Sequence, residues 1–96
     1  MRIYTPEEIR QAVPEWLTTL KEDFPDAAWV GNLAPMMQEL CKIAGTAPSV
    51  DLSRLGALRS RLSTLIEGQR NLKGLLPLIW MADSLGNHSA SYTHDI

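Results

Sequence analysis

Apolar residues recur at intervals of three and four over most of the chain, which is the spacing of one face of an α-helix. In the N-terminal segment this face consists of Ile9, Val13, Trp16, Leu17, Leu20 and Phe24. Thr5, Pro6 and Glu8 have the order of a capping box, which predicts that the first helix begins at Pro6. Pro14 interrupts the face, so we expect either a kink there or a break into two short helices.

A second helical pattern covers residues 29–44. Asp26 is a candidate N-cap for it, and Asn32, with Pro35 in the following turn, is a candidate restart. Gly45 is predicted to be the residue just after the end of this helix, because glycine commonly terminates helices.

The third pattern covers residues 52–69, with Ser49 or Asp51 as the cap. Four leucines form a seam with 3-4-3 spacing, Leu55, Leu58, Leu62 and Leu65. The opposite face is made of small residues, Ser53, Gly56, Ala57, Ser60 and Thr64. Small side chains let another helix approach closely, so this face is a candidate helix–helix or dimer contact. The alternative is an ordinary solvated face.

The last pattern covers residues 75–85, with Pro77 in its first turn and Gly86 at its end. It is apolar on nearly all sides, with Leu75, Leu78, Ile79 and Ala82 on one face, Leu76 and Trp80 on a second, and Met81 on a third. One helix buries a stripe somewhat over ~100° wide against its neighbours. We therefore expect Trp80 and Met81 to lie outside the core, against a second copy or a partner. The competing interpretation is a central helix surrounded within one chain.

No segment has a convincing strand pattern, so the predicted fold class is all-α. We expect a compact bundle of four to five short helices, some of them kinked or broken at prolines. Residues 1–86 are predicted to form a single helical domain, and the polar residues 87–96 a disordered tail.

Composition narrows the functional classes. The chain has 96 residues and a net charge of −2, which argues against bulk attraction to nucleic acid or anionic membranes. The longest uncharged apolar run, residues 74–82, is far shorter than the roughly 20 residues of a membrane helix. A single cysteine, and an N-terminus without the apolar core of a signal peptide, favour a soluble, cytoplasmic protein.

Few residues have the pattern of a catalytic or metal site. Cys41 lies on an apolar face and is interpreted as a buried, inert thiol. His88 and His94 do not share a helix face and have no cluster of further ligands. Because no nucleotide-binding, hydrolase or zinc-peptidase motif occurs, we predict no catalysis, no cofactor and no metal.

The basic residues are concentrated in one part of the chain. Residues 49–74 carry five basic and two acidic side chains, a balance of +3, and the basic ones are Arg54, Arg59, Arg61, Arg70 and Lys73. They flank the leucine seam on two sides and do not form one stripe, so we expect guanidinium groups that face acidic neighbours. A helical nucleic-acid-binding regulator that uses this cluster is the alternative.

The leading hypothesis is a small non-catalytic protein-binding module, such as an adaptor, a chaperone-like subunit or a stoichiometric inhibitor, acting as a homodimer. Tryptophan, methionine and arginine are enriched in protein interfaces. The predicted partner-binding residues are Leu76, Trp80, Met81, Arg54 and Arg61. A nucleic-acid-binding regulator is the second hypothesis, and a small enzyme is the third.

Overall fold

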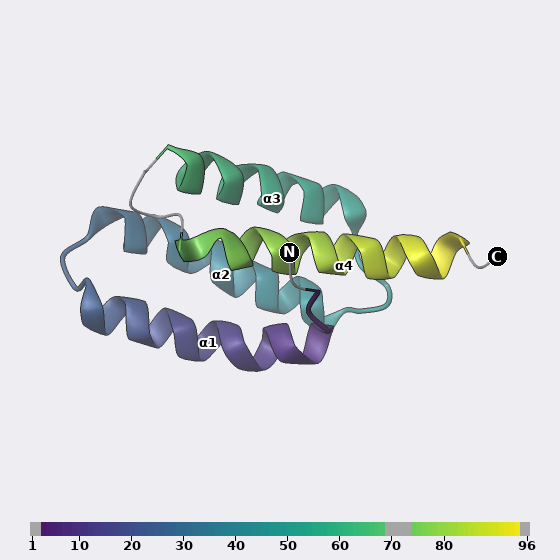
Figure 1. Cartoon of the computed structure of the whole chain (residues 1–96), viewed down its shortest axis with the longest axis horizontal. Helices are drawn as coiled ribbons and strands as arrows, with labels where there is room; N and C mark the ends of the chain where they lie inside the picture. The colour runs from purple at the N-terminus through teal and green to yellow at the C-terminus, as the bar shows by residue number, and fades with distance from the viewer. Residues whose placement is uncertain (1–2, 69–73, 95–96) are drawn as a thin grey trace.

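The described part of the chain folds into four helices without a strand, as the apolar spacing predicted. The computed structural model describes residues 3–68 and 74–94, with side chains up to Gly86. The helices are α1 (Pro6–Asp23), α2 (Ala28–Gly45), α3 (Leu52–Glu67) and α4 (Leu76–His94). Each helix is antiparallel to the one before it, and the C-terminal part of α4 extends beyond the other three helices (Figure 1).

Two predicted helix starts are confirmed, and one is wrong. At the start of α1, Thr5 Oγ1 accepts a hydrogen bond from the Glu8 N–H, and Glu8 Oε1 accepts one from the Thr5 N–H, each at 3.1 Å. Asp51 caps α3 by accepting from the Arg54 N–H, also at 3.1 Å. Asp26, in contrast, is not the cap of α2, because the N-cap is Ala27 and it makes no side-chain cap hydrogen bond.

The predicted helix breaks at the prolines do not occur, while the kink expected as the alternative at Pro14 stays a prediction. α1 continues through Pro14, and α2 continues through Pro35 without a restart at Asn32. Both prolines are exposed, so each interrupts the hydrogen bonding on the solvent side of its helix. Packing of the buried face holds each helix together across the interruption.

Glycine does not end these helices as predicted. Gly45 belongs to α2, whose C-cap is Thr46, and α4 continues through Gly86 to His94. No described glycine has a positive φ, so none adopts the left-handed conformation by which glycine usually terminates a helix. The prediction that the last helix ends at Gly86 was therefore wrong. The division of the chain into one helical domain and a disordered tail stays a prediction.

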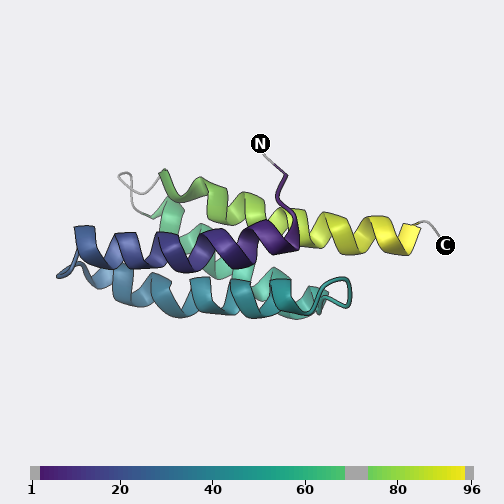
Figure 2. The same ribbon diagram turned by 90° about the horizontal axis from the view of Figure 1, so that it is seen from below.

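The core lies between α2 and α4, which are on opposite sides of the bundle, and α1 and α3 flank them (Figures 1 and 2). Each helix contributes a buried stripe at helical spacing. The largest fully buried side chains are Ile9, Val13, Leu33, Met37, Leu40, Leu58, Leu62, Ile66, Leu78 and Leu85. A single apolar core thus joins all four helices.

The predicted leucine seam of α3 is confirmed for its first three members but not for its last. Leu55, Leu58 and Leu62 are buried, and the next buried position is Ile66, while Leu65 is only half-buried. A straight helix has 3.6 residues per turn, so a stripe repeating every 3.5 residues drifts off the contact line. This drift turns Leu65 towards the outer surface of the bundle.

The N-terminal segment is attached to α4 by one buried hydroxyl. The Tyr4 N–H donates to Ser84 Oγ at 3.0 Å, and this hydroxyl donates to the Trp80 carbonyl at 2.7 Å. Ser84 is 2 % exposed, so the hydroxyl needs both bonds to offset its removal from water.

Two methionines provide a matched test of this packing. Met81 is 3 % exposed in the core, whereas Met36 is half-buried at the surface. Met81→Ala should lower the free energy of unfolding by about 2–5 kcal/mol, the usual loss for a buried methionine. Met36→Ala should lower it by clearly less. Urea denaturation of both variants measures the difference, and equal losses would contradict the placement of Met81.

Candidate functional site

Met81 does not lie in a surface patch, so this part of the predicted partner site is wrong. Its side chain is 3 % exposed and belongs to the core cluster. α4 packs against both α3 and α2, and the N-terminal segment is attached to it as well. A helix with neighbours on several sides buries more than one apolar stripe. This agrees with the competing interpretation of residues 75–85, in which the helix is surrounded within one chain.

The other predicted partner-binding residues remain at the surface but do not form one site. Leu76 and Trp80 are half-buried, four residues apart on α4. Arg54 and Arg61 are exposed, seven residues apart on α3. Of the five predicted residues, only Arg61 lines the groove described below.

Two arginines of the basic cluster form ion pairs with neighbouring helices, as the sequence interpretation expected. Arg59 Nε donates to Asp83 Oδ1 on α4 at 2.5 Å, and Arg59 Nη2 donates to Asp83 Oδ2 at 3.3 Å. The hydrogen bond that Arg59 donates to the Asp83 carboxylate raises the pKa of Arg59, so this guanidinium stays charged. Arg54 pairs with Glu39 of α2. Arg70 and Lys73 lie outside the described residues.

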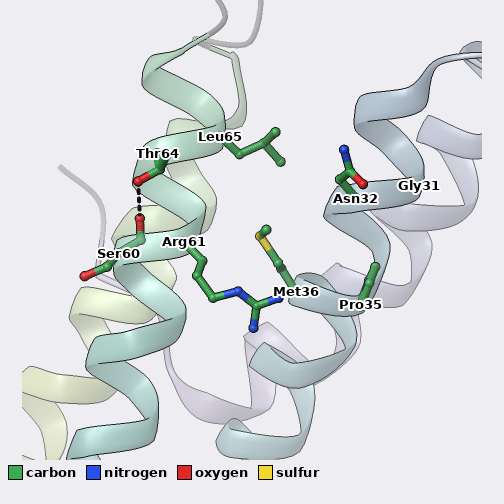
Figure 3. Close-up of a pocket in the computed structure, with 8 residues that line it drawn as sticks. All are labelled: Gly31, Asn32, Pro35, Met36, Ser60, Arg61, Thr64 and Leu65. Atoms are coloured by element: carbon green, nitrogen blue, oxygen red, sulfur yellow. Dashed lines mark hydrogen bonds between the residues drawn. The ribbon is translucent and has the colours of Figure 1, made fainter.

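A groove lies between α2 and α3 on the outer surface of the bundle (Figure 3). Its volume is about 580 Å³, and its lining residues are Gly31, Asn32, Pro35, Met36, Ser60, Arg61, Thr64 and Leu65. Figure 3 shows the side chains of Met36, Arg61 and Leu65 extending into the space between the two helices. Met36 and Leu65 are half-buried, and the other six lining residues are exposed.

Half of the eight lining residues of the groove are polar, but only one of them is charged. Arg61 is the only ionisable residue in its lining, and no ion pair joins it to a described residue. Pro35 has no N–H, so it cannot donate to the Gly31 carbonyl as a helical residue at that position would. The Thr64 hydroxyl donates to the Ser60 carbonyl at 2.9 Å within α3. The groove therefore combines the apolar side chains of Met36 and Leu65 with one cation and three uncharged polar side chains.

The small-residue face of α3 makes no close contact with another helix in the part of the chain that the structure describes. All five residues of this face, Ser53, Gly56, Ala57, Ser60 and Thr64, are exposed. Ser60 and Thr64 line the groove, while Gly56 lines a separate cavity of about 210 Å³ beside the Arg59–Asp83 pair. The predicted close approach is therefore absent between the described helices, and a contact with a second copy stays a prediction.

Sequence analysis assigned several groove residues to other roles. Leu65 was predicted to belong to the leucine seam, and Met36 follows the apolar spacing of its own helix. Pro35 was predicted to lie in the turn after a helix restart at Asn32, and this restart does not occur. Pro35 has no N–H for the carbonyl of Gly31, four residues earlier on an exposed turn, and this pattern is a signal that could have indicated the surface.

The remaining candidate groups are not assembled into a site. Cys41 is partly exposed, so it is less buried than predicted. Burial raises the pKa of the Cys41 thiol, and the charge of Arg10 opposes this with a smaller effect. No cluster of three potential metal ligands occurs among the described residues, and the side chains of His88 and His94 lie outside them. None of the described helices is long and apolar enough to cross a membrane.

Comparisons with known proteins add no family to this picture. No protein-family model matches the chain, and no curated protein and no solved structure matches it either.

The raised pKa of Cys41 can be measured by alkylation with iodoacetamide as a function of pH. Only the thiolate reacts, so the midpoint for the folded protein should lie above that for the urea-unfolded chain. Arg10→Gln should move the folded midpoint further upwards, because it removes the charge that lowers this pKa. Lys42→Gln is the control and should leave it unchanged. A folded midpoint below the unfolded one would show an activated thiol.

Proposed function

We propose that this protein is a small non-catalytic binding module that accepts a helical segment of a partner protein in the groove between α2 and α3. The observation that carries the proposal is the groove itself, an exposed surface with the apolar side chains of Met36 and Leu65 and one cation that lacks an ion-pair partner among the described residues. The binding site is thus different from the Trp80 and Met81 patch expected from the sequence.

The chemistry of the groove favours binding over catalysis at this place. General acid–base catalysis needs a group whose pKa lies near the operating pH. Arg61 is the only ionisable residue in the lining, and a guanidinium stays protonated at every physiological pH. Arg61 can bind and orient an anion, but it cannot exchange a proton with it.

The shape of the groove favours a macromolecule over a small ligand. A drug-sized ligand is usually buried over roughly 70–90 % of its surface, which requires an enclosed pocket. Six of the eight lining residues are exposed, so this groove is open along its length. An amphipathic helix can cover such a surface because it presents one apolar face and leaves the other in water.

Nucleic-acid binding is supported less well by the same surface. Phosphate binding depends on several cations that act together. Arg54 and Arg59 are already paired with Glu39 and Asp83, so of the three described arginines on α3 only Arg61 is left without such a pair.

Two tyrosine substitutions on α3 test the use of the groove. A display library of helical peptides, randomised on one face, is selected against the wild-type protein. Ser60→Tyr should weaken the binding of the selected peptides at least tenfold, because the tyrosine ring would occupy the groove. Ser53→Tyr, also exposed on α3 but outside the groove, is the matched control and should leave the affinity unchanged.

Circular dichroism of both variants shows whether the helices are retained. Peptides that bind Ser60→Tyr as tightly as the wild type, or a selection that yields no binding peptide, would refute the proposed function.

A further inference from the structure

The charge of the groove distinguishes one kind of partner from others. Arg61 extends from α3 towards α2 in Figure 3, and it is exposed. Arg59, the nearest arginine of α3 in the sequence, is paired with Asp83 of α4. Arg54, further along α3, is paired with Glu39 of α2. The groove therefore presents a single positive charge, and a carboxylate is the group that a guanidinium binds with two hydrogen bonds.

The apolar side chains of the groove add a second requirement. Met36 and Leu65 extend from the two helices into the space between them, and both are half-buried, so part of each side chain stays in water. An apolar side chain of a partner would remove this surface from water, which is favourable. Methionine also adapts its shape to different apolar partners.

The length of the groove sets the spacing of these two contacts. Its lining covers residues 31–36 of α2 and 60–65 of α3, which is about 8 Å at 1.5 Å per residue. Residues three or four apart on a helix have Cβ atoms about 5–6 Å from each other. A helix laid along the groove can thus place one apolar residue and one acidic residue of the same face within it.

A second copy of the folded chain does not offer such a helix. Its exposed large apolar residues, among those described, are Ile3, Phe24 and Leu52, which lie in separate parts of the chain. α1 carries several acidic residues, but Ile9 and Val13 of its apolar face are buried in its own core. A separate protein is therefore the better occupant.

We infer that the partner of this groove is an acidic amphipathic helix of another protein. An aspartate or glutamate of that helix pairs with Arg61, and an aliphatic residue three or four positions away packs on Met36 and Leu65. This inference rests on the proposed function and specifies the chemistry of its partner.

The test uses the library peptides that bind the wild-type protein and lose affinity for Ser60→Tyr. Their sequences should show an aspartate or glutamate three or four residues from an aliphatic residue. Fluorescence anisotropy with one such labelled peptide should show binding about tenfold weaker for Arg61→Gln, and weaker again for Arg61→Glu, since like charges then face each other. Lys42→Glu makes the same change of charge at an exposed residue of α2 outside the groove, and should have little effect.

A charge exchange makes the test specific for the pairing. A peptide with lysine in place of its acidic residue should bind Arg61→Glu more tightly than the original peptide does. Arg61 is exposed, so these variants should keep their helices, which circular dichroism verifies.

Each other outcome overturns the inference in a recognisable way. Groove-dependent peptides that bind Arg61→Glu as tightly as the wild type would leave the proposed function standing and refute the acidic partner. A dimer of the free protein that Ser60→Tyr dissociates in sedimentation would identify a second copy as the occupant. A labelled single-stranded RNA that binds more tightly than any peptide, and is lost on Arg61→Glu, would identify a nucleic acid. If no peptide depends on the groove, the proposed function and this inference fail together.

Discussion

The burial of α4 against its neighbours is the contact on which the rest of the structure depends. Leu78 and Leu85 of this helix are fully buried, and Met81 and Ala82 are nearly so. α4 packs on α3 and α2, and the N-terminal segment is attached to it through Ser84. In a chain of 96 residues the core is small, so the apolar surface that one helix buries is a large part of what stabilises the fold. Most apolar residues of the segment 75–85, which suggested a surface patch, are therefore buried within the protein.

This arrangement determines which surface remains available. α4 covers the inner side of α3, while the outer side of the contact between α2 and α3 has no third helix over it. Leu65 turns towards this outer side because the apolar repeat of α3 drifts relative to its own helical turn. Arg54 and Arg59 are occupied by ion pairs that tie α3 to α2 and α4. Arg61 makes no such pair with a described residue, and this difference gives the groove its charge.

The caps at two helix starts were predictable from the sequence, and the number of neighbours around α4 was not. The capping box at Thr5 and the cap at Asp51 depend on residues three positions apart, so a short stretch of sequence determines them. The burial of Met81 depends on how many segments pack around α4, and a short stretch of sequence does not determine that number. Proline and glycine were poor predictors of helix ends in this chain. α1 continues through Pro14 and α4 continues through Gly86, because packing of a continuous buried face stabilises each helix. The groove was missed because Met36 and Leu65 follow the same spacing as the residues of the core.

The central claim is that partners bind between α2 and α3 and not at the exposed part of α4. An amide correlation spectrum of the ¹⁵N-labelled protein, recorded while a selected helical peptide is added, tests it most directly. The account predicts that the largest shifts occur at Gly31, Met36, Ser60 and Leu65, with little change at Leu76 and at the indole of Trp80. Shifts concentrated at Leu76 and Trp80, with the groove unchanged, would contradict it.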